Sequence, residues 1–173
     1  FIKDDLDNVI FGTVIQDSKT SNITRESMLI SGYQQKIPAN TVTMACISSN
    51  KAITDGFNSI ATKNASSVVV GGVETMSDVP IKLSKPLRKT LLESRKWKTN
   101  TDKLKGISSI KLKDIGIEVP SITEFSTNET MGYSADKLSN KWGVSRQEQD
   151  EFAVRSHLLA SKAQEENLLT DVL

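Results

Sequence analysis

Cysteine and histidine are scarce in this chain, which has one residue of each type among 173. A single cysteine cannot form an internal disulfide, and one cysteine with one histidine is too small a set for a zinc site. We therefore expect a reducing compartment and no bound metal. Long apolar runs are also missing, because no segment approaches the roughly 20 residues that a membrane-spanning helix needs.

Proline, glycine and net charge are low as well. The chain has four prolines, nine glycines and a net charge of +1, with 37% hydrophobic and 25% charged residues. This composition is typical of a globular protein, and the length allows one domain with a sizeable core. The small net charge argues against a nucleic-acid partner. Because the chain starts with Phe1 and not with methionine, we expect any targeting peptide to have been removed or left out.

Hydrophobic patterning predicts alternating strands and helices in the first part of the chain. β-branched and apolar runs predict strands, and apolar residues at three- and four-residue spacing predict helices. The predicted strands are residues 9–15, 41–45 and 68–70, and the predicted helices run from about 22 to 32 and from just after Cys46 to about 64. The last strand, helix and strand form a βαβ unit.

The chain becomes strongly basic after about Ser77. Between residues 82 and 113 there are eleven lysines and arginines against two acidic residues. Ser84 and Pro86 suit the start of a short helix. Its apolar side would hold Leu87, Leu91 and Leu92, together with Trp97. Three interpretations of this basic segment stay open: a solvated face, a surface for the phosphates of a ligand, or an amphipathic element on an anionic membrane.

Two further helices are predicted after Pro120. Residues 129–141 form the first, which should stop near Gly143. Ser145 and Glu148 have the spacing of a capping box, so a second helix should begin there and run to about Glu166.

Cys46 lies where the predicted strand 41–45 ends and a helix begins. The thiolate is the reactive form of cysteine, and N–H groups at the start of a helix stabilise such an anion. The same groups can bind a developing oxyanion. The small residues Ser48 and Ser49 would let a substrate approach. These features favour a nucleophile, whereas the alternative is a buried cysteine that acts as a small hydrophobe.

A nucleophile needs a base, and the sequence offers no convincing one. His157 is the only histidine, but it lies inside the last predicted helix beside Arg155, where a solvated or boundary side chain is the simpler interpretation. Glu74 follows a buried strand, and we expect it to anchor a loop by hydrogen bonds rather than to catalyse. Gly71 and Gly72 alone are too short a signal for a phosphate-binding motif.

Four motifs, in order along the whole chain, resemble those of thiolases. They are residues 43–50 (TMACISSN), 68–77 (VVVGGVETMS), 129–136 (ETMGYSAD) and 145–153 (SRQEQDEFA). Within the family, residues 77–81 and 121–130 are most similar to mitochondrial long-chain 3-ketoacyl-CoA thiolases.

The resemblance implies a fold and a domain organisation. The fold class is α/β: one incomplete βαβ-type half of the layered αβαβα thiolase fold, plus an inserted, mainly helical loop domain. The implied domains are residues 1–76 as a partial N-terminal core, 77–159 as the loop domain with the basic segment 82–113, and 160–173 as the return to the core.

It also implies an activity, namely that of an acyltransferase of fatty-acid β-oxidation. Cys46 would take the acyl group of a 3-ketoacyl-CoA as a thioester, with its own backbone N–H in the oxyanion hole. Ser48 belongs to the same loop, and Met131 and Gly132 match a motif near the acyl and pantetheine path. Coenzyme A is a substrate, and no further cofactor is implied.

The resemblance implies partners and a location too. Thiolases dimerise, and the mitochondrial long-chain enzymes pair with an α subunit in a trifunctional complex. The location would be the mitochondrial matrix or the inner membrane, where the basic segment could face an anionic membrane surface.

The chain departs from the family pattern in one important respect. The family's H-E-A-F or N-E-A-F, G-H-P and C-x-G loops, which hold the activating histidine and a second cysteine, have no match here. Lys51 is an unusual charge near the start of the catalytic helix. We therefore expect the chain alone to be inactive. One alternative is a catalytically silent, thiolase-derived binding or assembly module that acts through its basic segment or a partner subunit; another is an unrelated cysteine-dependent fold.

Overall fold

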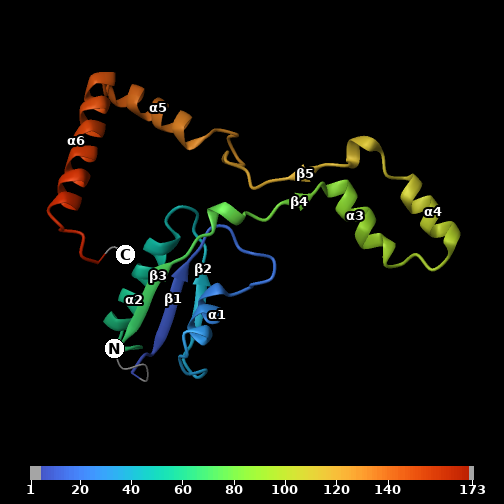
Figure 1. Ribbon diagram of the computed structural model, residues 1–173, viewed down its shortest axis with the longest axis horizontal. Helices are drawn as coiled ribbons and strands as arrows, with labels where there is room; N and C mark the ends of the chain where they lie inside the picture. The colour runs from blue at the N-terminus through green and yellow to red at the C-terminus, as the bar shows by residue number, and fades with distance from the viewer. Residues whose placement is uncertain (1–4, 172–173) are drawn as a thin grey trace. The chain divides into compact units, whose positions relative to one another are not determined.

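The computed structural model describes residues 5–171 (Figure 1). The chain divides into two compact units, the first ending at Pro120 and the second beginning at Ser121. Each unit is described separately. Within residues 5–171, no helix has both the length and the apolar composition needed to cross a bilayer.

The first unit is built on a three-stranded parallel sheet. Its strands are β1 (Asn8–Gly12), β2 (Ala39–Val42) and β3 (Val68–Gly72), in the spatial order β2-β1-β3. Val9 of β1 lies opposite Ala39 on one side and Val69 on the other. The first strand of the chain is therefore the central strand, an order that the sequence pattern does not reveal.

Two helices connect the three strands (Figure 1). α1 (Ile23–Ile30) joins β1 to β2, and α2 (Ser48–Ala61) joins β2 to β3 across β1. The predicted βαβ unit is thus present, with β1 lying between its two strands. Because the two connections run in opposite directions along the sheet and such crossovers are nearly always right-handed, the helices cover opposite faces.

Strand boundaries differ from those predicted near the carboxyl edge of the sheet. β1 ends at Gly12 rather than at residue 15, and β2 is Ala39–Val42 rather than residues 41–45. Cys46 therefore does not follow the strand directly, since residues 43–47 form a turn between β2 and α2. The helices agree better: α1 is capped by the Asn22 side chain, and Gly32 follows it with a φ of +76°.

The core lies on both faces of this sheet. On the α1 side, Leu6, Val9, Met28 and Ile37 form a buried cluster. On the α2 side, Ile10 and Ala52 are buried. α2 lies very close to β3, because a Cβ placed on Gly56 would come within 2.5 Å of Val70 Cγ1. The apolar strands and one face of each helix thus form the two hydrophobic layers that hold the unit together.

The rest of the first unit is a series of short elements. They are η1 (Met76–Asp78), β4 (Lys82–Leu83), α3 (Lys85–Ser94), α4 (Asn100–Ser108), η2 (Leu112–Asp114) and β5 (Ile117–Glu118). β4 and β5 pair antiparallel. The predicted helix start at Ser84 and Pro86 is confirmed. Trp97 lies beyond α3 and packs on α4, where the indole occupies the space that a Cβ on Gly106 would need.

The second unit holds α5 (Met131–Trp142) and α6 (Arg146–Glu165). Gly143 ends α5 with a φ of +68°, as predicted, and Ser145 with Glu148 forms the predicted capping box. The predicted domain boundary between residues 159 and 160 falls inside α6, and the proposed domain organisation stays a prediction.

Candidate active site

Cys46 lies in an open groove at the carboxyl edge of the parallel sheet. We call it the Cys46 groove; its volume is about 300 Å³. It is lined by residues 12–14 at the end of β1, by residues 72–74 at the end of β3, and by Ala45, Cys46, Ser48 and Ser49 in the turn and the start of α2. The carboxyl ends of strands are where open α/β sheets bind their ligands. Cys46 is exposed in this chain, and its predicted role as a nucleophile stays a prediction.

The turn that carries Cys46 is held by Ser48. The Ser48 side chain is 3% exposed. Its hydroxyl accepts a hydrogen bond from the Met44 N–H at 2.9 Å and donates one to the Ala45 carbonyl at 2.6 Å. The Ser48 N–H also donates to the Ala45 carbonyl, at 3.1 Å. Ser48 therefore joins the backbone just before Cys46 to the start of α2, while its predicted contact with substrate stays a prediction.

Ala45, immediately before Cys46, has an unusual backbone conformation. Its φ of +46° lies in the left-handed region, which disfavours residues with a Cβ. Such a residue costs on the order of 1–2 kcal/mol, and its surroundings must impose it. The two hydrogen bonds from Ser48 to the Ala45 carbonyl supply that constraint. The turn thus presents Cys46 outward, ahead of the helix.

Two glycines let the start of α2 lie directly on the edge of the sheet. A Cβ on Gly12 would come within 2.3 Å of the Ser48 carbonyl carbon and 2.4 Å of the Ser49 nitrogen. A Cβ on Gly72 would come within 1.9 Å of the Ser49 hydroxyl oxygen. Only glycine allows backbones to approach this closely. The positive end of the α2 dipole is therefore held at the carboxyl edge of the sheet, beside the groove.

Glu74 anchors the loop that follows β1, as the sequence predicts. Its carboxylate accepts hydrogen bonds from the Val14 N–H at 2.8 Å and from the Ile15 N–H at 3.2 Å, both at Oε2. The Val73 N–H donates to the Gly12 carbonyl at 3.0 Å, just before this contact. The ends of β1 and β3 are thus joined beyond the point where their sheet pairing stops.

The same loop is tied to the other neighbouring strand. The Thr13 N–H donates to the Val42 carbonyl at 3.1 Å, and the Gln16 amide donates to the Thr43 hydroxyl at 3.2 Å. Deeper in the sheet edge, the Thr24 and Thr41 hydroxyls lie 2.8 Å apart, and Thr24 is fully buried. The walls of the groove are therefore connected to β2 and β3 by hydrogen bonds.

The other residues singled out from the sequence take no part in these hydrogen bonds. Met131 and Gly132 begin α5 in the second unit, and His157 is an exposed residue of α6. Lys51, on α2, forms an ion pair with Asp55 one turn further on. The structure thus brings together Cys46 and Ser48, and the predicted roles of Met131 and Gly132 stay predictions.

Several residues that shape the groove carry no local sequence signal. The sequence pattern predicts Gly12 as part of a strand and Gly71 and Gly72 as a strand end, with no indication of a close approach to α2. The close approach at Gly12 depends on a helix that begins far along the chain, so no local pattern points to it.

Across residues 5–171, no three His, Cys, Asp or Glu side chains are placed to hold a metal ion.

Comparison with known proteins gives a consistent family assignment. Residues 2–173 match the family model described as the thiolase N-terminal domain. The chain is 53% identical to the bovine mitochondrial trifunctional enzyme subunit beta over 171 residues, which is 99% of this chain and 36% of that protein. It is 52% identical to a probable 3-ketoacyl-CoA thiolase of Caenorhabditis elegans over 168 residues, which is 97% of this chain and 38% of that protein.

A solved structure agrees with these sequence matches. The acetyl-CoA acetyltransferase of Bacillus anthracis superposes with a TM-score of 0.75 and 28% identity, over 98% of this chain and 39% of that one. The chain therefore spans little more than a third of the length of these proteins. The predicted thiolase-like α/β fold is confirmed, and the chain belongs to the thiolase family, where it corresponds to the N-terminal domain.

Proposed function

We propose that this chain carries the nucleophile of a 3-ketoacyl-CoA thiolase that acts in fatty-acid β-oxidation. The observation that carries the proposal is the exposed Cys46 in the groove at the carboxyl edge of the sheet, beside the start of α2. The name of the nematode relative supports the substrate class, and the name of the bovine relative supports a mitochondrial location. Within the mitochondrion, we propose the matrix or the inner membrane.

The proposed reaction has two steps. In the first, the Cys46 thiolate attacks the C3 carbonyl of a 3-ketoacyl-CoA, the C2–C3 bond breaks, and C2 takes a proton so that acetyl-CoA leaves. The shortened acyl group stays on Sγ as a thioester. In the second, the thiol of free CoA loses its proton and attacks this thioester, so that Cys46 leaves as the thiolate and a shortened acyl-CoA is formed.

The residues of this chain have distinct parts in that reaction. Each step passes through a tetrahedral oxyanion, for which the backbone N–H of Cys46 is the proposed donor. Ser48 holds the turn, and Met131 and Gly132 are proposed to line the acyl and pantetheine path. Coenzyme A enters as a substrate, and we propose no other cofactor.

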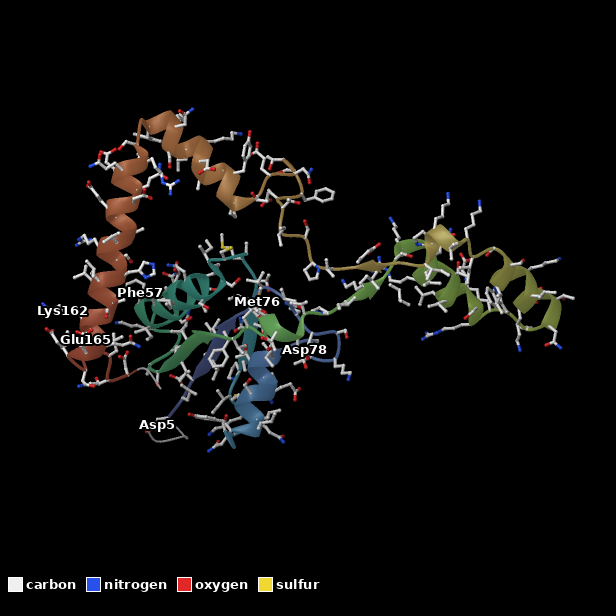
Figure 2. The ribbon with its side chains drawn as sticks, turned by 45° about the horizontal axis from the view of Figure 1, so that its top comes forward. Asp5, Phe57, Met76, Asp78, Lys162 and Glu165 are labelled. Atoms are coloured by element: carbon white, nitrogen blue, oxygen red, sulfur yellow. The ribbon has the colours of Figure 1, made fainter. Side chains whose placement is uncertain are left out.

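The proton transfers need an acid and a base that this chain does not supply in the proposed mechanism. His157 matches none of the family's catalytic loops and lies exposed on α6. In addition, α2 has an exposed apolar stripe of Ile53, Phe57 and Ile60, at a spacing that puts them on one helix face; Phe57 is labelled in Figure 2. Such a stripe fits one half of a layered fold. We therefore propose that the chain alone does not turn over.

A chimera tests this function. The chain would replace the matching 171 residues of the bovine subunit beta, and CoA-dependent cleavage of a 3-ketoacyl-CoA would be measured. We expect an active chimera, loss of at least about 10³-fold in kcat with Cys46→Ser, and little change with His157→Ala as the matched control. An active isolated chain, or an active Cys46→Ser chimera, would contradict the proposal.

A second candidate function is a catalytically silent module that binds an anionic membrane through the basic segment. One surface of α3 favours it, a shallow groove lined by Lys85, Arg88, Lys89, Leu92, Glu93 and Lys96. Leu92 is 63% exposed among these cations. Each basic residue near an anionic surface contributes about 1 kcal/mol of attraction. The membrane contact is compatible with the catalytic function, whereas a catalytically silent module is not, so each needs its own test.

Vesicle sedimentation distinguishes a specific membrane contact from non-specific attraction by the net charge of the chain. We expect the change of Lys85, Lys89 and Lys96, which line this surface, to Glu to abolish binding to vesicles rich in phosphatidylserine. The matched control changes Lys19, Lys36 and Lys63 to Glu and alters the net charge equally. These lysines are exposed residues of the sheet region, by which we mean Asn8–Gly72, from the start of β1 to the end of β3. Arg88 is left unchanged, because it forms an ion pair with Glu118 at 2.8 Å. Equal binding by both variants would exclude the membrane contact.

We also propose a homodimer and pairing with an α subunit. β2 is an edge strand whose described sheet neighbour is β1 alone, so its outer edge is open to a second copy. The name of the bovine relative supports a partner subunit in a trifunctional enzyme. Light scattering of the chimera, with and without the α subunit, would measure both associations.

A further inference from the structure

Glu74 makes a connection that the thiol chemistry does not explain. Its carboxylate reaches from the end of β3 to the loop after β1, where Oε2 accepts both the Val14 N–H and the Ile15 N–H. The second oxygen, Oε1, lies 3.3 Å from the Ile15 nitrogen. Hydrogen bonds to a charged acceptor are about twice as strong as neutral ones. Two strands that are neighbours in the sheet are therefore clamped by one side chain at their ends.

The clamped residues form part of the Cys46 groove. Thr13, Val14, Val73 and Glu74 line it opposite the turn that carries Cys46. The N–H groups of Val14 and Ile15 lie beyond the hydrogen-bonded part of the sheet, because β1 ends at Gly12. Without the carboxylate, these two donors would bond only to water, and this part of the wall would be free to move.

We propose that Glu74 is a positioning residue for the Cys46 groove. By holding the backbone of Val14 and Ile15, it sets the width of the groove and so decides how large a reagent reaches the Cys46 sulfur. Its importance for an acyl-CoA rests on the proposed function, whereas its effect on access to Cys46 does not.

Alkylation of Cys46 tests this inference on the 173-residue chain. Because Cys46 is the only cysteine, the rate constants of a small reagent, iodoacetamide, and a bulky one, N-phenylmaleimide, report on this site alone. Each rate constant is divided by that of the same reagent with glutathione, and the ratio of bulky to small reagent is then taken. Because both reagents react with the thiolate, a change in the thiolate fraction of Cys46 cancels, and the ratio measures how accessible the sulfur is. We expect Glu74→Ala to raise the normalised ratio of bulky to small reagent about fivefold.

Two variants control for charge and for stability. Glu74→Gln keeps an oxygen that can accept both N–H groups, so its ratio should match the wild type. Asp7 makes a similar clamp at the opposite end of the sheet, where its Oδ2 accepts the Ser66 N–H at 2.7 Å and the Ser67 N–H at 3.2 Å. Asp7→Ala should therefore lower stability without changing the ratio. Glu74 would be merely structural if Asp7→Ala shifted the ratio as much as Glu74→Ala.

A measurement on the unaltered chain covers the case in which Glu74→Ala does not fold. Amide hydrogen exchange at Val14 and Ile15 should be slowed relative to neighbouring loop residues such as Ser18. Unprotected exchange at both positions would overturn the inference, as would an unchanged alkylation ratio in a folded Glu74→Ala chain. Neither outcome bears on whether Cys46 takes an acyl group.

Discussion

The sheet region and the helices after Lys82 differ most in burial. Every buried residue among those described lies between Leu6 and Gly56, in β1, α1, α2 and the segments beside them. The helices α3, α4, α5 and α6 contain none. They nevertheless expose apolar side chains such as Leu138 and Leu158. Short-range signals are thus enough to define a helix, whereas a core requires a second surface to pack against.

The largest expected contrast is between two glycines. Gly12→Val places a branched side chain against the Ser48–Ser49 backbone and should destabilise the sheet region by more than about 2 kcal/mol. Gly132, in α5, has no atom within 4 Å of its added Cβ. Gly132→Ala should therefore stabilise α5 by about 0.5–1 kcal/mol. Urea unfolding followed by circular dichroism would measure both, and equal effects would remove the contrast.

Truncation of two apolar side chains should show the same contrast. Met28 is 4% exposed in the core, so Met28→Ala should cost about 2–5 kcal/mol. Leu104 of α4 is 70% exposed, and Leu104→Ala should change stability by no more than about 0.5 kcal/mol. Thermal unfolding would detect the difference. A large loss in Leu104→Ala would mean that α4 is buried in solution.

A smaller and local effect is expected at the start of α6. Ser145→Ala removes the side chain that accepts the Glu148 N–H at 3.2 Å, and should weaken the first turn of α6 by about 1 kcal/mol. Amide exchange should accelerate in that turn and stay unchanged in β1. Faster exchange in both regions would show that α6 stabilises the sheet.

Acid should affect the two regions through different carboxylates. Hydrogen bonds from the Ser66 and Ser67 N–H groups lower the pKa of Asp7 below its ordinary 3.8, and bonds from Ser145 lower the pKa of Glu148 below its ordinary 4.5. Each contribution is complete above the ordinary value and is lost as the pH falls through the lowered one. In an acid titration followed by circular dichroism, Asp7→Asn should therefore make the stability of the sheet region fall less steeply as the pH is lowered.

Features that depend on neighbouring residues could be predicted from the sequence, and features that depend on contacts between distant segments could not. Ser84, Gly143 and Ser145 act on residues within one or two turns, and the helix ends that they predict are found in the structure. The predicted end of β2 is wrong, because this end depends on the Ala45 conformation and on the hydroxyl of Ser48 rather than on β-branched content. The order β2-β1-β3 and the close approach at Gly12 depend on contacts between distant segments, which no local pattern contains.

The candidate site also has parts that the sequence predicts and parts that it does not. Cys46 could be singled out because a turn between a strand and a helix leaves a local signature, and the loop-anchoring role of Glu74 followed from its place after a strand. Which loop Glu74 anchors could not be predicted, since Val14 and Ile15 come from a different strand. The physical reason is that hydrogen bonds beyond the sheet edge depend on strand order.

Covalent trapping tests the central claim most directly. The chimera with the bovine subunit would be mixed with a 3-ketoacyl-CoA, and the reaction would be quenched in acid during turnover. The protein would then be digested, and the mass of the peptide that contains Cys46 would be measured by mass spectrometry. We predict that this peptide gains the mass of the shortened acyl group and loses it when free CoA is added before quenching. Turnover without any acyl group on Cys46, or with the acyl group on another residue, would contradict the account.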